Sequence, residues 1–196
     1  MGKGRLEAFS DGVIAVLITI MVLEMKAPHG HAWEDLRPLL PILMSYVLSF
    51  VFLGIYWNNH HHILHAIKHV NGSIMWANLH LLFWLSLVPF TTAWMGENHF
   101  EALPTSIYGV VLLASGVAFN LLVKLLVRHH GRDSLLATAI QGDKRGLVST
   151  GLYATAIGAA WITPWISWAC YVAVALLWLV PDRRIEKAIA HGNHGE

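Results

Sequence analysis

The chain has 196 residues, of which 56% are hydrophobic and 13% are charged, and its mean hydropathy is +0.53. This composition is too apolar for a soluble domain of this size, so we expect an integral membrane protein. The formal net charge of +1 provides no basic surface for nucleic acid, and the single cysteine, Cys170, excludes an internal disulfide.

Six apolar segments are candidates for membrane-spanning helices. A hydrocarbon core about 30 Å thick takes roughly 20 residues of helix. Residues 147–181 form one apolar block that is too long for a single crossing, and Thr163-Pro164 near its middle predicts a helical hairpin. We therefore predict an all-α integral membrane protein with six transmembrane helices, over residues 6–26, 38–60, 73–95, 104–127, 146–163 and 165–181.

The first segment is expected to be retained as a helix. Glu7 and Asp11 precede its apolar part, and no small-residue cleavage site of a signal peptide follows it. No internal repeat, low-complexity tract or linker is present in the sequence. We predict one six-helix transmembrane domain over residues 1–182 and a short cytoplasmic tail over residues 183–196.

Positively charged residues predict the orientation of these helices. Six crossings place both termini on one side of the membrane, and only Lys26 and Arg37 would lie on the opposite side. Eleven positive residues would lie on the terminal side: Lys3, Arg5, Lys68, Lys124, Arg128, Arg132, Lys144, Arg145, Arg183, Arg184 and Lys187. The positive-inside rule then places both termini in the cytoplasm.

The first segment carries a narrow stripe of residues along one face. At 100° per residue, a sector about 60° wide contains Gly12, Val16, Thr19 and Leu23, with Ile20 on its flank. Asp11 lies about 100° from Gly12 and points elsewhere. The pattern alone is also compatible with packing or lipid contact, since a threonine hydroxyl can bond to its own helix.

Asp11 needs a partner. A charge costs on the order of 3 kcal/mol at the middle of a membrane helix and less near its end, and it is normally paired within the protein. Arg5 lies on a different face, and Glu7, four residues earlier, would repel it. We expect partners from the cytoplasmic ends of the second and third helices, where the candidates are His60, His61, Asn78 and His80. The alternative is an aspartate solvated at the membrane interface.

The histidines that end the second segment have two interpretations. His61, His65 and His69 share a face at intervals of four residues, and histidine is a common metal ligand. Because no carboxylate or cysteine stands among them, we favour a polar network between helices and predict neither a metal site nor a cofactor. The HExxH, GxSxG, P-loop and Rossmann motifs are absent, so we predict no enzymatic activity. The Gly-Tyr-Gly filter of ordinary potassium channels is also absent.

Three motifs resemble the transmembrane protein 175 family of lysosomal and prokaryotic potassium channels. They are Arg5-x-x-x-Phe9-Ser10-Asp11, Trp57-x-x-His60-His61, and Asn78 followed by Leu87-x-Pro89-Phe90. The resemblance covers nearly the whole chain, because six helices with cytoplasmic termini are also the family's bacterial single-repeat form. It implies a homotetramer in the lipid bilayer of a prokaryotic plasma membrane, with four copies of the first helix around a central pore for K⁺.

The resemblance also implies roles for residues of the first helix. Val16 would form the apolar ring that acts as constriction and gate, a role that Ile20 would share if the helix were rotated slightly. Thr19 would form a hydroxyl layer, and Leu23 an outer apolar ring. Family members often carry a larger residue at the first ring, so Leu23 is the other candidate for the narrowest point. Glu24, just beyond it, would raise the cation concentration at the outer mouth.

A further role implied by the resemblance is anchoring of the pore helix. Arg5, Phe9, Ser10 and Asp11 resemble the part of the family's first helix that packs on the second and third helices. The candidate contacts of this part are Trp57, His60, His61, Asn78 and His80.

We therefore predict a potassium channel of modest selectivity. An apolar ring offers no oxygen to replace an ion's water. Because potassium sheds its water more easily than sodium, such a ring would favour potassium modestly. Dewetting of the ring would close the path. One alternative is a proton-coupled secondary transporter, or a proton-permeable channel, that uses Asp11 and the histidines. Another is a non-conducting scaffold or metal-responsive membrane protein.

Overall fold

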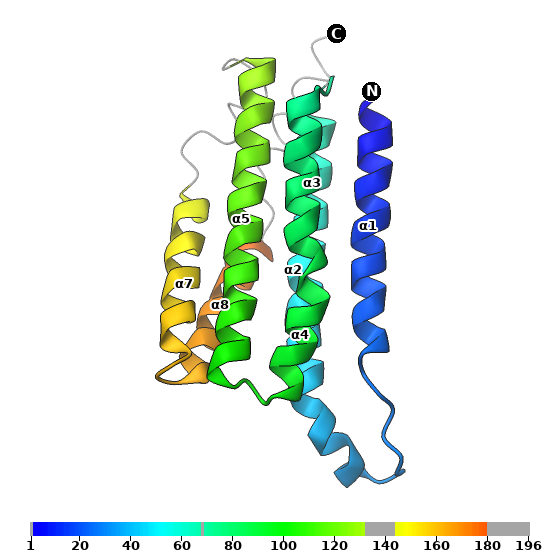
Figure 1. Cartoon of the computed structure of the whole chain (residues 1–196), viewed down its shortest axis with the longest axis vertical. Helices are drawn as coiled ribbons and strands as arrows, with labels where there is room; N and C mark the ends of the chain where they lie inside the picture. The colour runs from blue at the N-terminus through cyan, green and yellow to red at the C-terminus, as the bar shows by residue number, and fades with distance from the viewer. Residues whose placement is uncertain (1, 68, 132–143, 180–196) are drawn as a thin grey trace.

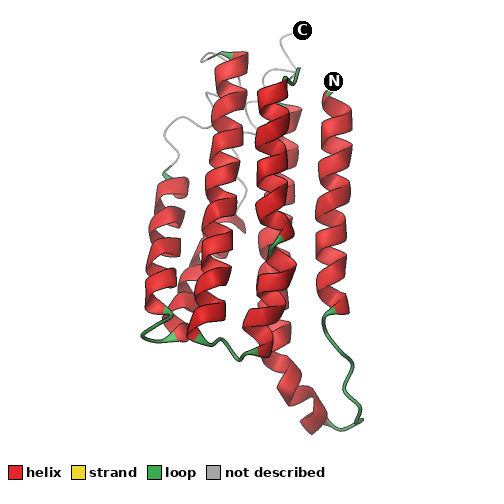
Figure 2. Cartoon of the chain, in the orientation of Figure 1, coloured by secondary structure: helices red, strands yellow, loops and turns green. Residues whose placement is uncertain are grey.

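The computed structural model describes residues 2–67, 69–131 and 144–179. All regular structure within those residues is helical, which confirms the predicted all-α class and can be followed in Figure 2. In chain order the elements are α1 (Lys3–Leu23), the 3₁₀ helix η1 (Trp33–Leu39), α2 (Leu40–His65), α3 (Gly72–Ser86), α4 (Val88–Glu97), α5 (Ala102–His130), α7 (Arg145–Ala159) and α8 (Pro164–Leu179). They form an elongated bundle with α1 at one edge and the α7–α8 pair at the other (Figure 1).

Four helical stretches are long and apolar enough to cross a membrane: Lys3–Leu23, Trp33–His65, Gly72–Glu97 and Ala102–His130. The hairpin predicted at Thr163-Pro164 is confirmed, since α7 ends at Ala159 and α8 begins at Pro164. These two helices contain only 15 and 16 residues. At about 1.5 Å per residue they are shorter than a hydrocarbon core of about 30 Å, so their crossing of the bilayer stays a prediction.

The third predicted helix, over residues 73–95, is in fact two helices that meet at Leu87. Pro89 is the second residue of α4, and proline removes one backbone donor and clashes with the carbonyl four residues earlier. Just after the proline, the side chain of Thr91 donates to the carbonyl oxygen of Leu87 at 3.1 Å, and that of Thr92 donates to the carbonyl oxygen of Val88 at 2.7 Å. Both hydroxyls are therefore paired within the first turns of α4.

The second helix is longer than predicted at its histidine end. The expected boundary was residue 60, whereas α2 continues to His65 and Ala66 caps it. No glycine or proline interrupts residues 55–65, and the next helix begins only after Asn71, whose side chain accepts from the backbone nitrogen of Ile74 at 3.0 Å. His61, His62 and His65 are therefore helical residues and not part of a turn.

Two apolar cores hold the bundle together. One lies among α1 to α5 and includes Ile14, Leu53 and Leu81, while the other joins α2, α4 and α5 to the α7–α8 hairpin. The hairpin packs closely on α5: the Tyr171 hydroxyl donates to the Thr105 carbonyl at 2.8 Å, and a Cβ at Gly109 would collide with that hydroxyl. Gly109 thus permits the close approach of α5 and α8.

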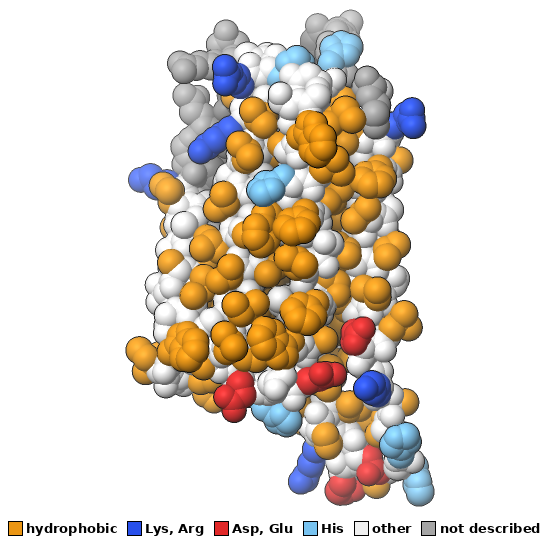
Figure 3. Space-filling model, viewed as in Figure 1, with side chains coloured by type: hydrophobic (Ala, Val, Ile, Leu, Met, Phe, Trp, Pro, Cys, Tyr) orange, Lys and Arg blue, Asp and Glu red, His pale blue; other side chains and the backbone are white. Residues whose placement is uncertain are grey.

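Charged side chains gather at the two ends of the bundle. Figure 3 shows apolar side chains over the middle of one face and acidic side chains toward its lower end. The start of α1 lies at the same end as the last turns of α2 and α5 (Figure 1). The described cations of that end are Lys3, Arg5, Lys124, Arg128, Lys144 and Arg145. The other five predicted cations of the terminal side and the predicted tail, residues 183–196, lie outside the described residues.

Candidate functional site

One face of α1 packs on the bundle and the opposite face is uncovered. The buried residues recur every three or four positions and are Leu6, Ser10, Ile14, Leu17 and Met21. On the opposite face Val16 is 60% exposed, Ile20 41% and Leu23 78%, and Gly12 and Thr19 are exposed as well. We call Gly12, Val16, Thr19, Ile20 and Leu23 the exposed stripe. In a single chain the predicted pore-lining residues are therefore exposed.

α1 is also the least covered of the long helices. Only 28% of an apolar 18-residue segment of α1 is buried, compared with 39–50% of the corresponding segments of the other three membrane-length stretches. Apolar surface of this extent is stable in contact with lipid or with another protein surface. The position of α1 at the edge of the bundle leaves room for either (Figure 1).

Three buried polar side chains connect α1, α2 and α3. The side-chain amide of Asn78 donates to Ser10 Oγ at 2.9 Å, and Asn78 Oδ1 lies 2.7 Å from His60 Nε2. Ser10 in turn donates to the carbonyl oxygen of Leu6 at 2.9 Å. All three side chains are completely buried. Because Asn78 Oδ1 can only accept, His60 Nε2 must carry the proton.

A second set of contacts forms a row between α1 and α2, which run antiparallel. Trp57 Nε1 donates to Asp11 Oδ1 at 3.1 Å, and His61 Nδ1 lies 3.1 Å from Glu7 Oε1. One turn further, Lys3 Nζ reaches the carbonyl oxygen of His65 at 3.4 Å. We call these three pairs the α1–α2 contact row. Each step of four residues along α1 matches a step of four along α2, so one helical turn separates successive pairs.

The structure brings together most of the predicted anchoring residues, and three stay apart. Arg5 and Phe9 are exposed, Phe9 by 52%, because they lie on the same side of α1 as the exposed stripe. His80 is exposed and its ring lies against Trp84, since it is two residues, or about 200° of helix, from Asn78. Glu24 caps the far end of α1 and is exposed there.

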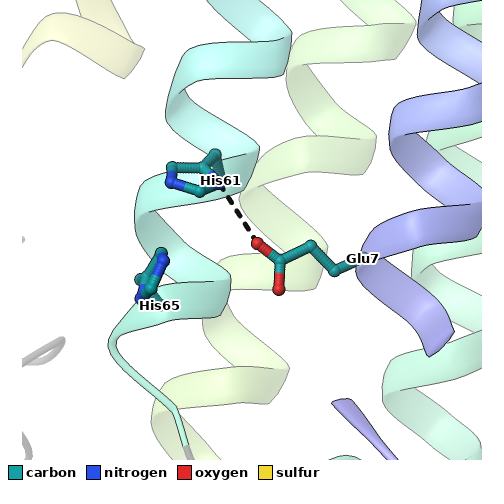
Figure 4. A group of neighbouring side chains, drawn as sticks. All are labelled: Glu7, His61 and His65. Atoms are coloured by element: carbon teal, nitrogen blue, oxygen red, sulfur yellow. Dashed lines mark ion pairs between the residues drawn. The ribbon is translucent and has the colours of Figure 1, made fainter. Parts of the chain in front are cut away.

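Three residues of the contact row were not predicted: Lys3, Glu7 and His65. Figure 4 shows Glu7 extending from α1 toward His61 and His65 on α2. A sequence signal for them exists, because residues 3, 7 and 11 on one helix and 57, 61 and 65 on the next all have side chains that can form hydrogen bonds and recur at intervals of four. Two antiparallel helices with this matched spacing can pair turn by turn.

The chain is similar to known proteins. Residues 5–89, which contain the exposed stripe, the Ser10-Asn78-His60 contacts and two of the three pairs of the α1–α2 contact row, match the family model of the endosomal/lysosomal potassium channel TMEM175. A potassium channel of Chryseobacterium sp. (strain P1-3) is 50% identical over 189 residues, which are 96% of this chain and 98% of that protein. The endosomal/lysosomal proton channel TMEM175 of Danio rerio is 23% identical over 65% of this chain and 24% of its own length.

A solved structure is similar to the whole bundle. It is the crystal structure of a homologue of the lysosomal potassium-selective channel TMEM175 from Chamaesiphon minutus. The TM-score is 0.79 at 31% identity, and the match covers 92% of this chain and 97% of the other. The similarity therefore extends to the arrangement of the helices and not only to the motifs.

Proposed function

The chain belongs to the TMEM175 family, and we propose that it is a potassium-selective cation channel of modest selectivity. The observation that carries this proposal is the exposed stripe of α1. It combines apolar side chains with one hydroxyl along a face that the rest of the chain leaves open. Membership of a family whose relatives are named potassium channels supports the same activity.

The conducting unit is a homotetramer in the lipid bilayer of the cell membrane, with both termini in the cytoplasm. A single chain has one such stripe and cannot enclose a path for ions. Four copies arranged around an axis, each turning the stripe of α1 inward, would enclose one and would cover the apolar surface that a single chain exposes. The grouping of cations at the end where α1 starts supports the orientation.

Two apolar rings would control passage through this pore. Four copies of Val16 and four of Leu23 present only methyl groups, so neither ring replaces the water around an ion. A narrow ring of this kind admits potassium more readily than sodium, because potassium loses water at lower cost, and it closes by dewetting. Ile20 lies between the two rings and adds to the apolar wall.

Thr19 is suited to contact a partly dehydrated cation. Its hydroxyl lies 3.2 Å from the Ala15 carbonyl oxygen and 3.0 Å from the Val16 carbonyl oxygen. Because the hydroxyl proton is used within the helix, the oxygen lone pairs are left to face the pore. Four such oxygens between the Val16 and Leu23 rings would favour a cation over an anion there. Glu24 would add negative charge at the outer mouth.

The two sets of polar contacts would hold the pore helix at a fixed rotation. The Ser10-Asn78-His60 network fixes the buried face of α1, and the Asp11–Trp57 bond fixes its flank. A rotation of α1 by even a fraction of a turn would have to break these bonds before it moved Val16 or Leu23 out of the stripe. The contacts therefore act on conduction through position and not through contact with the ion.

Proton permeation is the second candidate function. The relative from Danio rerio is named a proton channel, and a water-filled pore can pass protons as well as potassium. Asp11 and His60 are turned toward the bundle, so a proton path in this chain would follow the exposed stripe and not a relay through these two residues.

Reconstitution into liposomes tests the proposal. The purified full chain is placed in vesicles with a potassium, sodium or proton gradient, and flux is followed with ion-sensitive dyes against protein-free vesicles. We expect potassium flux that does not saturate, slower sodium flux, and no requirement for a proton gradient. Saturable flux that depends on a proton gradient would indicate a transporter, and absence of any flux would reject the channel.

A further inference from the structure

The carboxylate that the histidine-rich end of α2 lacks in the linear sequence comes from α1. Glu7, His61 and His65 each offer one ligand atom, and these atoms lie within 4.8 Å of one another. The ring centroids of His61 and His65 are 4.6 Å apart, because the two residues are separated by one helical turn (Figure 4). His69 and His62 are not part of this group.

We propose that Glu7, His61 and His65 form a binding site for a divalent transition-metal cation of the zinc class. Two imidazoles and one carboxylate are a donor set that zinc uses, with the fourth position open to water. Histidines at i and i+4 on one helix face are a recurring zinc-binding arrangement. Magnesium and calcium prefer all-oxygen sites, so this set discriminates against them.

The geometry requires only a small adjustment. With bonds of about 2.0–2.2 Å in a tetrahedron, two ligand atoms are about 3.4 Å apart. Glu7 Oε1 and His61 Nδ1 are already 3.1 Å apart. His65 is exposed, so its ring is free to turn toward the other two ligands. The approach from solvent is open, since the side chain of His61 is 38% exposed and that of Glu7 20%.

The surroundings of the site are compatible with a cation. The positive group nearest to it in the contact row, Lys3 Nζ, is bonded to the backbone carbonyl of His65 and not to the ligand atoms. The His61 ring stacks against Trp57, with centroids 6.2 Å apart, and Trp57 bonds to Asp11. A bound metal would therefore join α1 to α2 one turn from the Asp11–Trp57 pair and would strengthen the attachment of α1 to the bundle.

Direct binding of Zn²⁺ alone tests this site independently of any ion flux. The full chain is purified with an affinity tag that contains no histidine, and Zn²⁺ is titrated by calorimetry and by equilibrium dialysis. We expect one Zn²⁺ per chain and a higher melting temperature with Zn²⁺ present. Glu7→Gln and His65→Asn should each weaken binding about tenfold or more, since loss of even an outer-shell partner costs 10–100-fold.

His62→Asn is the matched control, because His62 is in the same last turn of α2 but outside the ligand group. It should bind Zn²⁺ with unchanged affinity. His65→Asn alters an exposed side chain and should fold normally, which keeps the test interpretable if Glu7→Gln proves unstable. Absence of bound Zn²⁺, or equal loss of binding in His62→Asn and His65→Asn, would overturn the proposal whether or not the chain conducts ions.

Discussion

Asp11 on α1 accepts a hydrogen bond from the indole nitrogen of Trp57 on α2, with 3.1 Å between Oδ1 and Nε1. The bond crosses between the two helices where an unpaired carboxylate would be costly. It also directs the carboxylate toward α2 and away from the exposed stripe, where an ion would pass. We therefore assign Asp11 a positioning role in the proposed channel.

Weakening of this bond should weaken assembly and leave selectivity unchanged. Asp11→Asn keeps an oxygen that can accept the bond but removes the charge that strengthens it, whereas Trp57→Phe removes the donor and keeps an aromatic ring. Trp57→Phe should cost on the order of 1 kcal/mol, the usual scale for hydrogen bonds between membrane helices, and Asp11→Asn less. Melting temperatures of the detergent-solubilised assembly measure the effect, and the double variant should melt no lower than the worse single variant. A well-assembled Asp11→Asn protein with altered ion selectivity would contradict the assignment.

Removal of Asn78 should be more damaging than removal of the Ser10 hydroxyl, one of its two partners. Asn78→Leu leaves Ser10 Oγ without its donor and His60 Nε2 without an acceptor, and each unsatisfied buried group costs about 1–3 kcal/mol. Ser10→Ala leaves only one amide proton unpaired. Thermal denaturation should rank the variants in that order. His80→Leu, on the exposed side of the same helix, is the control and should melt close to the parent protein.

Thr19 should contribute to discrimination between potassium and sodium. Thr19→Ala removes the hydroxyl layer and is expected to lower selectivity while conduction persists, and Thr19→Ser should retain it. Bi-ionic reversal potentials in planar bilayers provide the measurement. Thr155→Ala is the control. Thr155 is also exposed, and its hydroxyl donates to the Gly151 carbonyl oxygen of its own helix at 2.9 Å. An unchanged reversal potential in Thr19→Ala would remove Thr19 from the mechanism.

Polar substitution at the constriction should increase leak. Val16→Asn and Leu23→Asn each place a hydrogen-bonding group where dewetting would close the pore, so basal potassium flux should rise at whichever ring is narrower. Val117→Asn is a matched control: Val117 is 55% exposed, close to the 60% of Val16, but it lies on α5. If neither α1 variant changes flux relative to Val117→Asn, the pore does not follow this stripe.

The local pattern of the first helix could be predicted because helical geometry is regular. The 100° step separates the stripe of Gly12, Val16, Thr19 and Leu23 from Asp11, and in the structure the stripe is exposed while Asp11 is bonded to Trp57 of α2. The hairpin at Thr163-Pro164 was also predictable, since proline commonly begins a helix and rarely continues one. Both predictions depend only on residues near one another in the chain.

Features that depend on contacts between helices were harder to predict. The histidines looked like a group without a carboxylate because Glu7, their partner, is 54 or more residues away in the sequence. The break at Leu87 was missed because the apolar character continues through it and Pro89 alone does not fix where a helix divides. Arg5 and Phe9 belong to the same motif as Ser10 and Asp11, yet side-chain direction places them on the uncovered side.

Chemical access to a cysteine in the stripe tests the central claim most directly. In a Cys170→Ala background, Val16→Cys and the control Val117→Cys are reconstituted, and potassium flux is measured before and after a small thiol-reactive cation is added. If four copies of α1 line the pore, the reagent should block most of the flux in Val16→Cys and leave Val117→Cys unaffected. Full flux after complete modification of Val16→Cys would contradict the account.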